Sequence, residues 1–386
     1  MPKSSLFAML FLTIAFAGAT SAAMTKTTFE SAVDKIGNGD HMVGLAVAIV
    51  REGEVSSINT YGVREYGRPE KIDSNTVFRI ASLSKTFAAT VTGQLIEEKK
   101  LSLESPITKF NKNFALRDQA QAESATLSHV LSHRLSLPPY AYDNLLEAGV
   151  TPSKILQEMK KVTPICKVGK CYAYQNVGFN MITSAVKDAT GQDYAELVNS
   201  RLFKPLGMKD ASFGKHNLIA SGNWARSHRR STGFSWVVRD VKQPYYDLPA
   251  AGGVNASILD LSKWLSAHMG NATEIISEQT LNMLHTPVVK THAELRRNKQ
   301  LGRLTDAYYG LGWRIYTYAG QTVVNHSGSV EGYTAQIAFL PKYDVGIVAL
   351  SNSRSREFWS ILPLFLDHEL GLTNKSLVDA EVHDEL

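Results

Sequence analysis

Apolar and polar residues along the chain form two kinds of pattern, one typical of strands and one typical of helices. Residues 43–50 and 55–61 are apolar, β-rich runs separated by a polar turn, which predicts an antiparallel hairpin. Apolar residues recur at helical spacing through residues 81–98, so a helix is expected there, with a serine able to cap its start. Helical pieces broken by loops are expected over residues 100–248.

Short apolar strands return later in the chain, and we place them at residues 323–325, 334–340 and 345–350. Turns are expected at Gly328, Gly332 and Pro341. A final helix is expected over residues 356–370. Strands near both chain ends around a helical middle predict one antiparallel sheet, built from the two ends of the chain and flanked by helices.

This organisation predicts an α/β fold of the α+β kind, formed as a single unit over residues 24–386. Its α/β part is expected over about residues 30–99 and 249–372. A helical insertion over about residues 100–248 would account for the length of the chain without a second domain.

The first residues have the order of a secretory signal peptide. Lys3 supplies a positive charge, residues 6–19 are uncharged and mostly apolar, and small residues follow. We expect a signal peptide over residues 1–23, with cleavage after Ala22 or Ala23. The apolar run is shorter than the roughly 20 residues that a membrane span needs, so no stable membrane span is expected. A retained membrane anchor is the alternative.

The last residues, 383–386, read HDEL, which is an endoplasmic-reticulum retention signal when it follows a signal peptide. The favoured interpretation is a bacterial protein that is periplasmic or secreted. The lumen of the reticulum is the alternative, if the source is eukaryotic.

Composition excludes some classes of protein but does not indicate a function. The chain has 386 residues, of which 44% are hydrophobic and 20% charged, with two cysteines. These values exclude a disordered chain and a disulfide scaffold. The net charge of +5 is small for this length and gives no reason to expect nucleic acid as a partner. The basic runs at residues 227–230 and 294–303 are interpreted as solvated loops.

The first candidate for chemistry is an S-x-x-K pattern, Ser82 to Lys85, at the start of the predicted helix. Residues at i and i+3 of a helix are neighbours, so the Lys85 amine can reach the Ser82 hydroxyl. A serine hydroxyl is a weak nucleophile until an adjacent group takes its proton. The start of a helix adds free backbone N–H groups and a partial positive charge beside the reacting atom.

Two later motifs follow in order: Tyr174 and Asn176 form a Y-x-N pattern, and His326 and Gly328 form an H-x-G pattern. With S-x-x-K, this order resembles the penicillin-recognising serine hydrolases, which include class C β-lactamases, D-Ala-D-Ala carboxypeptidases, penicillin-binding proteins and related esterases. The resemblance covers about residues 40–370. Its flanking segments are FRIASLSKTF, KLSLESPITKF, LFKPLGM, PAAGGVNASILDLSKWL, YGLGW and NHSGSVEGYTAQIAFLP.

The resemblance implies a β-lactamase/transpeptidase-like fold and a role for each motif residue. Ser82 would be the acylated nucleophile, and Lys85 would help to deprotonate it. Tyr174 would move the proton to the leaving group and later activate water. Because the ordinary pKa of tyrosine is near 10, two neighbouring cations would be needed to make Tyr174 a useful base at neutral pH. Asn176 would donate its amide to the acyl-amide carbonyl of the substrate.

The remaining expectations concern substrate binding. The backbone N–H groups of Ser82 and Ser329, next to Gly328, would form the oxyanion hole. His326 would face the substrate carboxylate, at a position where many relatives carry Lys. No K-[ST]-G motif occurs in the chain. A histidine is neutral for much of its time at pH 7, so less efficient β-lactam turnover is expected than with Lys.

The two cysteines, Cys166 and Cys171, lie just before Tyr174, and in an exported protein they are expected to form a disulfide. His129 and His133, at i and i+4, could hold a metal. The favoured interpretation is that they are buried, hydrogen-bonded histidines. We therefore expect neither a metal nor another cofactor.

Together these observations predict an exported, monomeric serine acyl-hydrolase of the class C β-lactamase or D-Ala-D-Ala peptidase type, acting through an acyl-Ser82 intermediate. Its expected partners are a small-molecule β-lactam or a peptidoglycan-derived peptide. The alternatives are a carboxylesterase with the same catalytic residues, a penicillin-binding or regulatory homologue without turnover, and a membrane-anchored cell-wall interaction protein.

Overall fold

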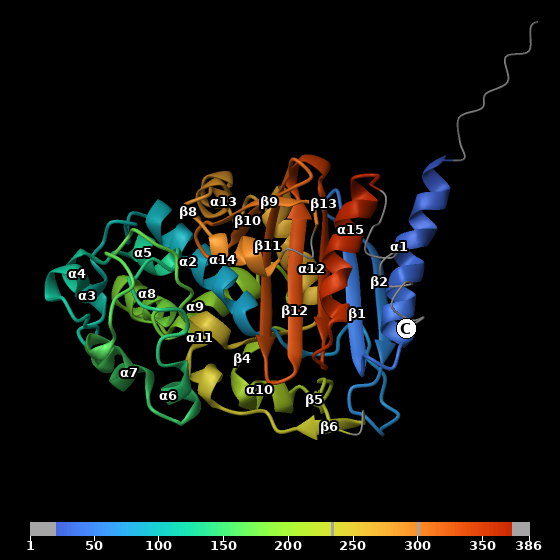
Figure 1. The fold of residues 1–386 in the computed structure, drawn as a ribbon, viewed down its shortest axis with the longest axis horizontal. Helices are drawn as coiled ribbons and strands as arrows, with labels where there is room; N and C mark the ends of the chain where they lie inside the picture. The colour runs from blue at the N-terminus through green and yellow to red at the C-terminus, as the bar shows by residue number, and fades with distance from the viewer. Residues whose placement is uncertain (1–20, 233–234, 299–301, 373–386) are drawn as a thin grey trace, which may run out of the picture.

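The computed structural model describes residues 21–232, 235–298 and 302–372. Its centre is an eight-stranded antiparallel sheet with the order β2-β1-β13-β12-β11-β10-β9-β8 (Figure 1). The strands are β1 Gly44–Arg51, β2 Glu54–Gly62, β8 Val289–Lys290, β9 Leu304–Tyr309, β10 Arg314–Tyr318, β11 Gln321–Val330, β12 Tyr333–Leu340 and β13 Val345–Ser351. The hairpin β1–β2 pairs with β13, so the two ends of the chain share one sheet.

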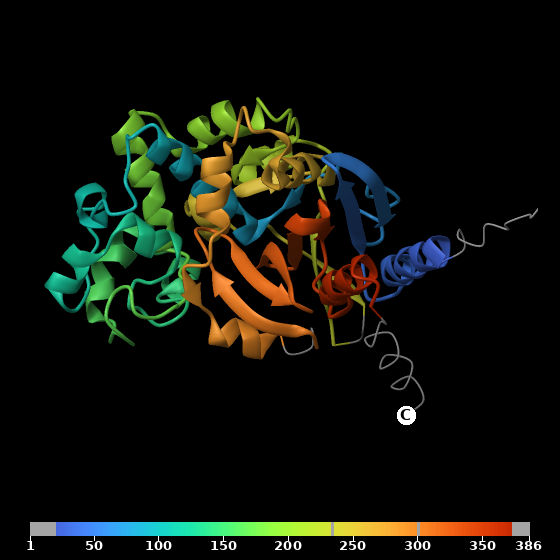
Figure 2. The same cartoon turned by 90° about the horizontal axis from the view of Figure 1, so that it is seen from above.

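Helices cover both faces of this sheet (Figure 2). On one face, α1 (Ser21–Asn38) packs beside α15 (Ile361–Glu369), and Phe29 meets Phe365 there. On the other face lie α12 (Ile258–Ser266) and, beyond it, α2 (Ser84–Glu97) and α13 (Glu278–His285). Phe87 of α2 stacks on Trp264 of α12 with 4.0 Å between the ring centroids.

The period-2 alternation of a strand explains how β1 serves both layers. Its alternate residues Ala46, Ala48 and Val50 belong to the core under α2 and α12. Leu45, Val47 and Ile49 belong to the core under α1 and α15. Both sets are buried, which is why residues 43–50 form a continuous apolar run rather than an alternating one.

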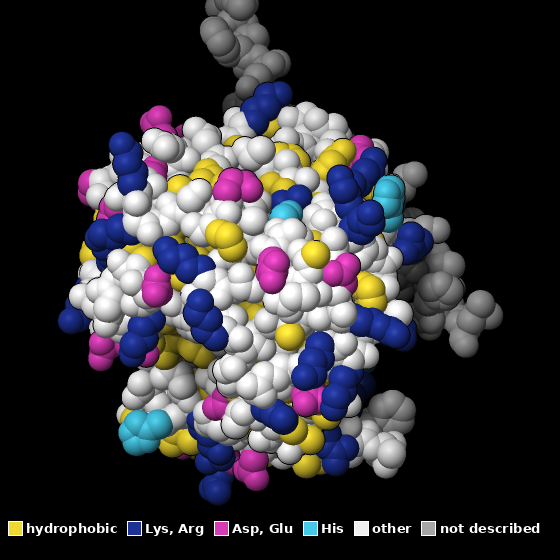
Figure 3. All heavy atoms as spheres, turned by 90° about the vertical axis from the view of Figure 1, so that its left-hand side faces the viewer, with side chains coloured by type: hydrophobic (Ala, Val, Ile, Leu, Met, Phe, Trp, Pro, Cys, Tyr) yellow, Lys and Arg dark blue, Asp and Glu magenta, His cyan; other side chains and the backbone are white. Residues whose placement is uncertain are grey.

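Short helices and most strands of two small sheets lie in the part of the chain between α2 and α12, whereas β3 comes just before α2. The helices are α3 Ile107–Phe110, α4 Gln119–Ser124, α5 Leu127–Leu131, α6 Asp143–Glu147, α7 Pro152–Glu158, α8 Ile182–Thr190, α9 Tyr194–Val198, α10 Gly214–Ala220 and α11 Pro249–Gly252; α14 (His292–Arg297) comes later. The small sheets are β3 Phe78–Arg79, β7 Val254–Ala256 and β4 Ser212–Phe213, and β5 Ser227–Arg230 with β6 Trp236–Arg239. On the face drawn in Figure 3, acidic and basic side chains are interspersed.

The predicted α+β fold class is confirmed, and so are the hairpin and the three later strands. Three details differ. Gly328 lies inside β11 and not in a turn, because β11 extends to Val330. The sheet continues through β10, β9 and β8, which were not predicted. Residues 227–230 form β5, whose His228 is buried, instead of a solvated loop.

Two predicted segments fall largely or wholly outside the description of the structure. Residues 1–20 of the expected signal peptide and residues 383–386 lie outside the described residues, and α1 begins at Ser21, beside the expected cleavage positions. None of the helices in the described part of the chain combines the length and hydrophobicity that a bilayer-spanning helix requires.

Candidate active site

Ser82 lies in a short 3₁₀ helix, Ala81–Leu83, that leads directly into α2. The residue before it, Ala81, has a left-handed φ of 49°, a conformation that costs free energy in a residue with a side chain. The Ser84 hydroxyl stabilises this turn, since it donates to the Ala81 carbonyl at 2.7 Å and accepts from the Val254 N–H at 3.0 Å. The strained turn is therefore tied to β7.

The end of β11 passes directly against the Ser82 turn. A Cβ at Gly328 would lie 2.3 Å from the Ile80 carbonyl oxygen and 2.9 Å from the Ser82 nitrogen, so only glycine fits. Strand β10 pairs with β11 only as far as Asn325, opposite Arg314. The rest of β11 consequently has an edge that no strand of the main sheet occupies on that side, and Ser329 on this edge lines the cavity in front of Ser82.

The Lys85 amine is buried behind Ser82 and has three polar neighbours. It lies 3.2 Å from the Ser82 hydroxyl, 2.8 Å from Oδ1 of Asn176 and 2.9 Å from the Ala251 carbonyl oxygen. Burial holds the pKa of Lys85 well below its ordinary value; Asp143 opposes this shift. The low pKa favours the neutral amine.

The geometry gives a neutral Lys85 one possible arrangement. The Asn176 and Ala251 oxygens can only accept hydrogen bonds, so they take the two N–H groups of the amine. Its lone pair is then left for the proton of the Ser82 hydroxyl. This is the arrangement that a general base for Ser82 requires.

Asn176 is oriented by Asp143. Its amide nitrogen donates to Oδ2 of Asp143 at 2.6 Å, which directs Oδ1 of the same amide toward Lys85. The Tyr245 hydroxyl approaches the same Asp143 oxygen at 3.4 Å. Burial raises the pKa of Asp143, while the hydrogen bond from Asn176 and the charge of Lys85 act to lower it. Asp143 was not recognised in the sequence.

Tyr174 has two basic side chains near its ring, the buried Lys85 amine and the charged Arg314 guanidinium. Nζ of Lys85 is 4.7 Å from its ring centroid, and Cζ of Arg314 is 5.5 Å away. Burial raises the pKa of Tyr174, whereas Arg314 and the Ser82 hydroxyl favour its ionised form. Arg314 was missed in the sequence analysis. Its only signal is its place directly after the YGLGW segment, residues 309–313.

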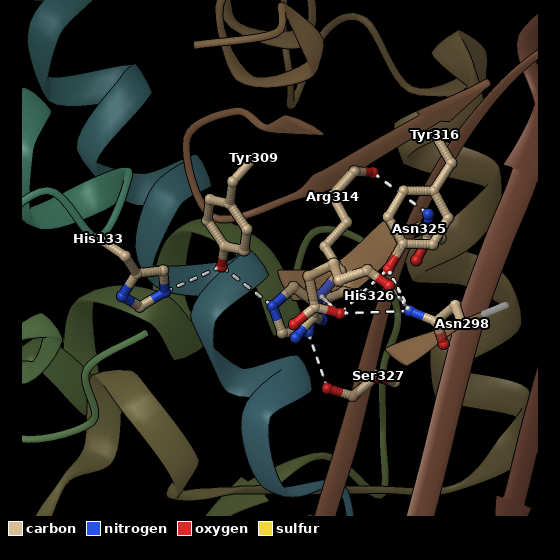
Figure 4. Close-up of polar contacts among 9 residues, drawn as sticks. His133, Asn298, Tyr309, Arg314, Tyr316, Asn325, His326 and Ser327 are labelled. Carbon is tan, nitrogen blue, oxygen red and sulfur yellow. Dashed lines mark hydrogen bonds and ion pairs between the residues drawn. The ribbon is translucent and has the colours of Figure 1, made fainter. Parts of the chain in front are cut away.

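Arg314 is buried in the wall of the cavity together with Glu294. The two side chains form an ion pair with 3.5 Å between Nε of Arg314 and Oε2 of Glu294. Nη1 of Arg314 is buried without a hydrogen-bond partner among the described residues. The carboxylate of Glu294 also accepts from Asn298 and from Tyr316 (Figure 4). The prediction of a solvated loop is therefore wrong for Glu294, which lies in α14 and belongs to this wall.

His326 lies in a hydrogen-bonded chain behind the cavity (Figure 4). Its Nε2 is 3.0 Å from the Tyr309 hydroxyl, which is 3.2 Å from Nε2 of His133. Nδ1 of His326 faces the Ser327 carbonyl, and Nδ1 of His133 accepts from the N–H of Gln175. Both histidines are fully buried.

These contacts assign the protons of the two histidine rings and of the Tyr309 hydroxyl. Because a carbonyl only accepts, Nδ1 of His326 carries a proton and its Nε2 accepts from Tyr309. Because Nδ1 of His133 accepts from a backbone N–H, its Nε2 donates to the Tyr309 oxygen. Both rings are neutral, and burial holds the pKa of each histidine well below its ordinary value.

The site residues predicted from the motifs thus separate into two groups. Ser82, Tyr174, Asn176, Gly328 and Ser329 line one cavity of about 560 Å³, with Lys85 directly behind Ser82. His326 does not line this cavity. Additional lining residues include Tyr140, Asp143, Tyr245, Glu294, Arg314 and Gln336.

The segment before Tyr174 is clamped onto a neighbouring loop. Cys166 and Cys171 form a disulfide, with 6.3 Å between their Cα atoms. The loop has left-handed φ angles at His133, Ser136, Tyr140 and Tyr142. The Ser136 hydroxyl donates to the Cys166 carbonyl, and the Tyr140 N–H donates to the Tyr174 carbonyl at 2.8 Å. These hydrogen bonds hold Tyr174 against the loop and stabilise the loop's left-handed φ angles, which cost free energy.

The two histidines considered as metal ligands are separated. His129 accepts from the N–H of Thr126 and caps α5, whereas His133 lies past the end of that helix. Both are hydrogen-bonded and His133 is fully buried, as the favoured interpretation held. Within the described residues, no group of three or more histidine, cysteine, aspartate or glutamate side chains is placed to hold a metal.

The antiparallel sheet flanked by helices, together with a serine, lysine and tyrosine around one cavity, is typical of the penicillin-recognising serine hydrolase superfamily. The family model described as Beta-lactamase matches residues 29–363. The chain therefore belongs to the Beta-lactamase family.

Individual relatives are distant. The chain is similar to unguisins hydrolase ungD of Aspergillus violaceofuscus, at 24% identity over 80% of this chain and 58% of the relative. It is also similar to protein flp of Staphylococcus aureus strain MW2, at 24% identity over 85% of this chain and 62% of the relative. The chain thus spans about three-fifths of the length of these relatives.

Among solved structures, the octameric penicillin-binding protein homologue from Pyrococcus abyssi matches with a TM-score of 0.78. Its sequence is 25% identical, and the match covers 92% of this chain and 78% of that one.

Proposed function

We propose that this protein is a serine acyl-hydrolase that acts through an acyl-Ser82 intermediate. The observation that carries the proposal is the position of the Lys85 amine, whose two N–H groups are taken by carbonyl oxygens and whose lone pair is left for the Ser82 hydroxyl. Membership of the Beta-lactamase family supports it.

In the proposed reaction, Lys85 takes the Ser82 proton as the serine oxygen attacks the substrate carbonyl. The N–H groups of Ser82 and Ser329 stabilise the oxyanion of the tetrahedral intermediate, and losing one such donor costs about 3 to 4 kcal/mol. When the intermediate collapses, the bond to the leaving group breaks and Tyr174 relays the proton to that group. Water then attacks the acyl-enzyme, giving up its proton to the same base system, and the acid product and Ser82 are released.

We assign the binding of a substrate carboxylate to Arg314 rather than to His326. Arg314 lines the cavity, is permanently charged and has a free donor at Nη1. His326 is fully buried and both its ring nitrogens are engaged. In this proposal His326 positions β11, and the absence of a K-[ST]-G lysine does not remove carboxylate recognition.

The proposed substrates are β-lactams or peptides of the D-Ala-D-Ala type, as in class C β-lactamases and carboxypeptidases. A carboxylesterase with the same residues is the second candidate, since Arg314 is partly neutralised by Glu294 and an uncharged leaving group could also be accepted. We further propose export with removal of residues 1–23, and a monomeric state; amino-terminal sequencing of the secreted protein and its mass in solution test these two proposals.

One experiment tests the activity. The protein is incubated with a chromogenic cephalosporin, a fluorescent penicillin and an uncharged 4-nitrophenyl ester. Ser82→Ala is expected to abolish covalent labelling and turnover, whereas Ser153→Ala, an exposed serine on α7, is expected to behave as the wild type. Labelling with slow release indicates a peptidase, fast β-lactam turnover a β-lactamase, and ester turnover alone an esterase. Equal behaviour of wild type and Ser82→Ala with all three compounds contradicts the proposal.

A further inference from the structure

A second charged group faces the cavity on the side of Asn176. Asp143, the first residue of α6, lines the cavity and is only 8% exposed. Its Oδ2 accepts from Asn176 at 2.6 Å and lies 3.4 Å from the Tyr245 hydroxyl. Its other carboxylate oxygen, Oδ1, is buried without a hydrogen-bond partner among the described residues. A buried carboxylate oxygen without a donor is costly, so a group that supplies one is expected to bind there.

The charge around Asp143 indicates which kind of group fits. The nearby cation is Lys85, on the other side of the Asn176 amide. When Lys85 is the neutral base that Ser82 needs, this counter-charge is lost. The other ionisable groups in contact, Tyr245 and the Glu147 carboxylate that accepts from it at 2.9 Å, add no positive charge. A cationic ligand group would therefore be favoured.

The walls of this corner also suit a cation. Tyr140 and Tyr245 line the cavity together with Asp143. Aromatic faces attract ammonium groups, and a carboxylate beside them supplies a charge-assisted hydrogen bond. Arg314 pairs with Glu294, whereas Asp143 contacts Asn176 and Tyr245. The cavity thus carries an acidic group and a basic group at separate places.

We propose that Asp143 binds the ammonium group of the acyl part of the substrate. The preferred substrates are then peptides, amides or esters of an amino acid with a free α-amine, whose carbonyl is attacked by Ser82. This inference rests on the acyl-Ser82 mechanism of the proposed function but changes the preferred substrates, because the nitrogen beside the attacked carbonyl is acylated in β-lactams and in D-Ala-D-Ala peptides. The ammonium group donates a hydrogen bond to Oδ1 of Asp143, while the Asn176 amide still donates to Oδ2.

The test compares D-alanine 4-nitroanilide, whose α-amine is charged, with its N-acetyl derivative, in which the amine becomes a neutral and larger amide. The wild type is expected to prefer the free amine in kcat/KM by on the order of tenfold or more, which is the worth of one charge-assisted hydrogen bond. Asp143→Asn is expected to bring the two values to within about twofold of each other. Glu147→Gln, which removes a neighbouring exposed charge outside the cavity, is expected to keep the preference.

Two results overturn the inference. One is a wild type without preference for the free amine. The other is an Asp143→Asn variant that loses the same factor with both substrates, because Asp143 would then act only by orienting Asn176.

Binding to Ser82→Ala separates this inference from the proposed function, because it needs no catalysis. Calorimetry with D-alaninamide and N-acetyl-D-alaninamide is expected to show tighter binding of the free amine. Equal affinities overturn the inference even if Asp143→Asn fails to fold. Turnover of the uncharged ester that does not depend on Ser82 would instead contradict the proposed function.

Discussion

Removing the Tyr309 hydroxyl is the most direct test of the hydrogen bonds that join His133, Tyr309 and His326 behind the cavity. This hydroxyl accepts from His133 and donates to His326, and both histidines are fully buried. Tyr309→Phe keeps the ring and its contacts with Tyr174 and Arg314 but removes this link. One buried donor, on His133, and one buried acceptor, on His326, lose their partner at once.

The magnitude follows from these two groups. Leaving a buried polar group unsatisfied costs about 1 to 3 kcal/mol. Tyr309→Phe is therefore expected to lower the free energy of unfolding by about 2 to 6 kcal/mol. The variant is also expected to lower kcat, because His133 accepts from the N–H of Gln175, next to Tyr174, and His326 donates to Ser327 on β11.

Urea unfolding followed by tryptophan fluorescence measures the change, with the slope m checking that the same transition is compared. Tyr343→Phe is a matched control, since Tyr343 is 41% exposed and its change is expected to stay within about 0.5 kcal/mol. A loss of less than about 0.5 kcal/mol in Tyr309→Phe would show that the hydroxyl does not join the two histidines.

Three further predictions concern charge, pH and the disulfide. Arg314→Gln should lower kcat/KM for a carboxylate-bearing β-lactam by about 10- to 100-fold more than for an uncharged ester, since one charged hydrogen bond is lost; equal losses would remove Arg314 from carboxylate binding. Burial lowers the pKa of six histidines, His129, His133, His228, His268, His285 and His326. The unfolded chain therefore binds more protons below about pH 6.5, and the free energy of unfolding should fall as pH decreases from 7.5 to 5, by up to about 1.4 kcal/mol per histidine and pH unit. Asp260, whose pKa burial raises to about 6, acts in the opposite sense, and urea midpoints across this range measure the balance. Replacing both Cys166 and Cys171 by Ser should lower the free energy of unfolding by about 2 kcal/mol on the loop-entropy relation, and an unchanged urea midpoint would contradict it.

Elements whose signal is local could be predicted from the sequence. The β1–β2 hairpin needs only two apolar runs and a turn, and the structure places both strands within a residue or two of the prediction. Strands β9 and β10 were missed, because polar and aromatic residues alternate there without a clear apolar face. Gly328 was assigned to a turn since glycine favours turns, but the structure uses its missing side chain for the contact with the Ser82 turn.

The sequence by itself determined that Ser82 and Lys85 are neighbours, since residues three apart on a helical turn must be. It also determined, through ordered motifs, that Tyr174 and Asn176 belong to the same site. Only the tertiary structure decided which other charges surround them. Glu294 and Asp143 carry no local signal, and Arg314 carries only its place after the YGLGW segment. His326 stands in a recognisable motif, but the structure buries it away from the cavity. The physical reason is that electrostatics depends on distance in space and on exclusion of water, and both are set by long-range packing rather than by spacing along the chain.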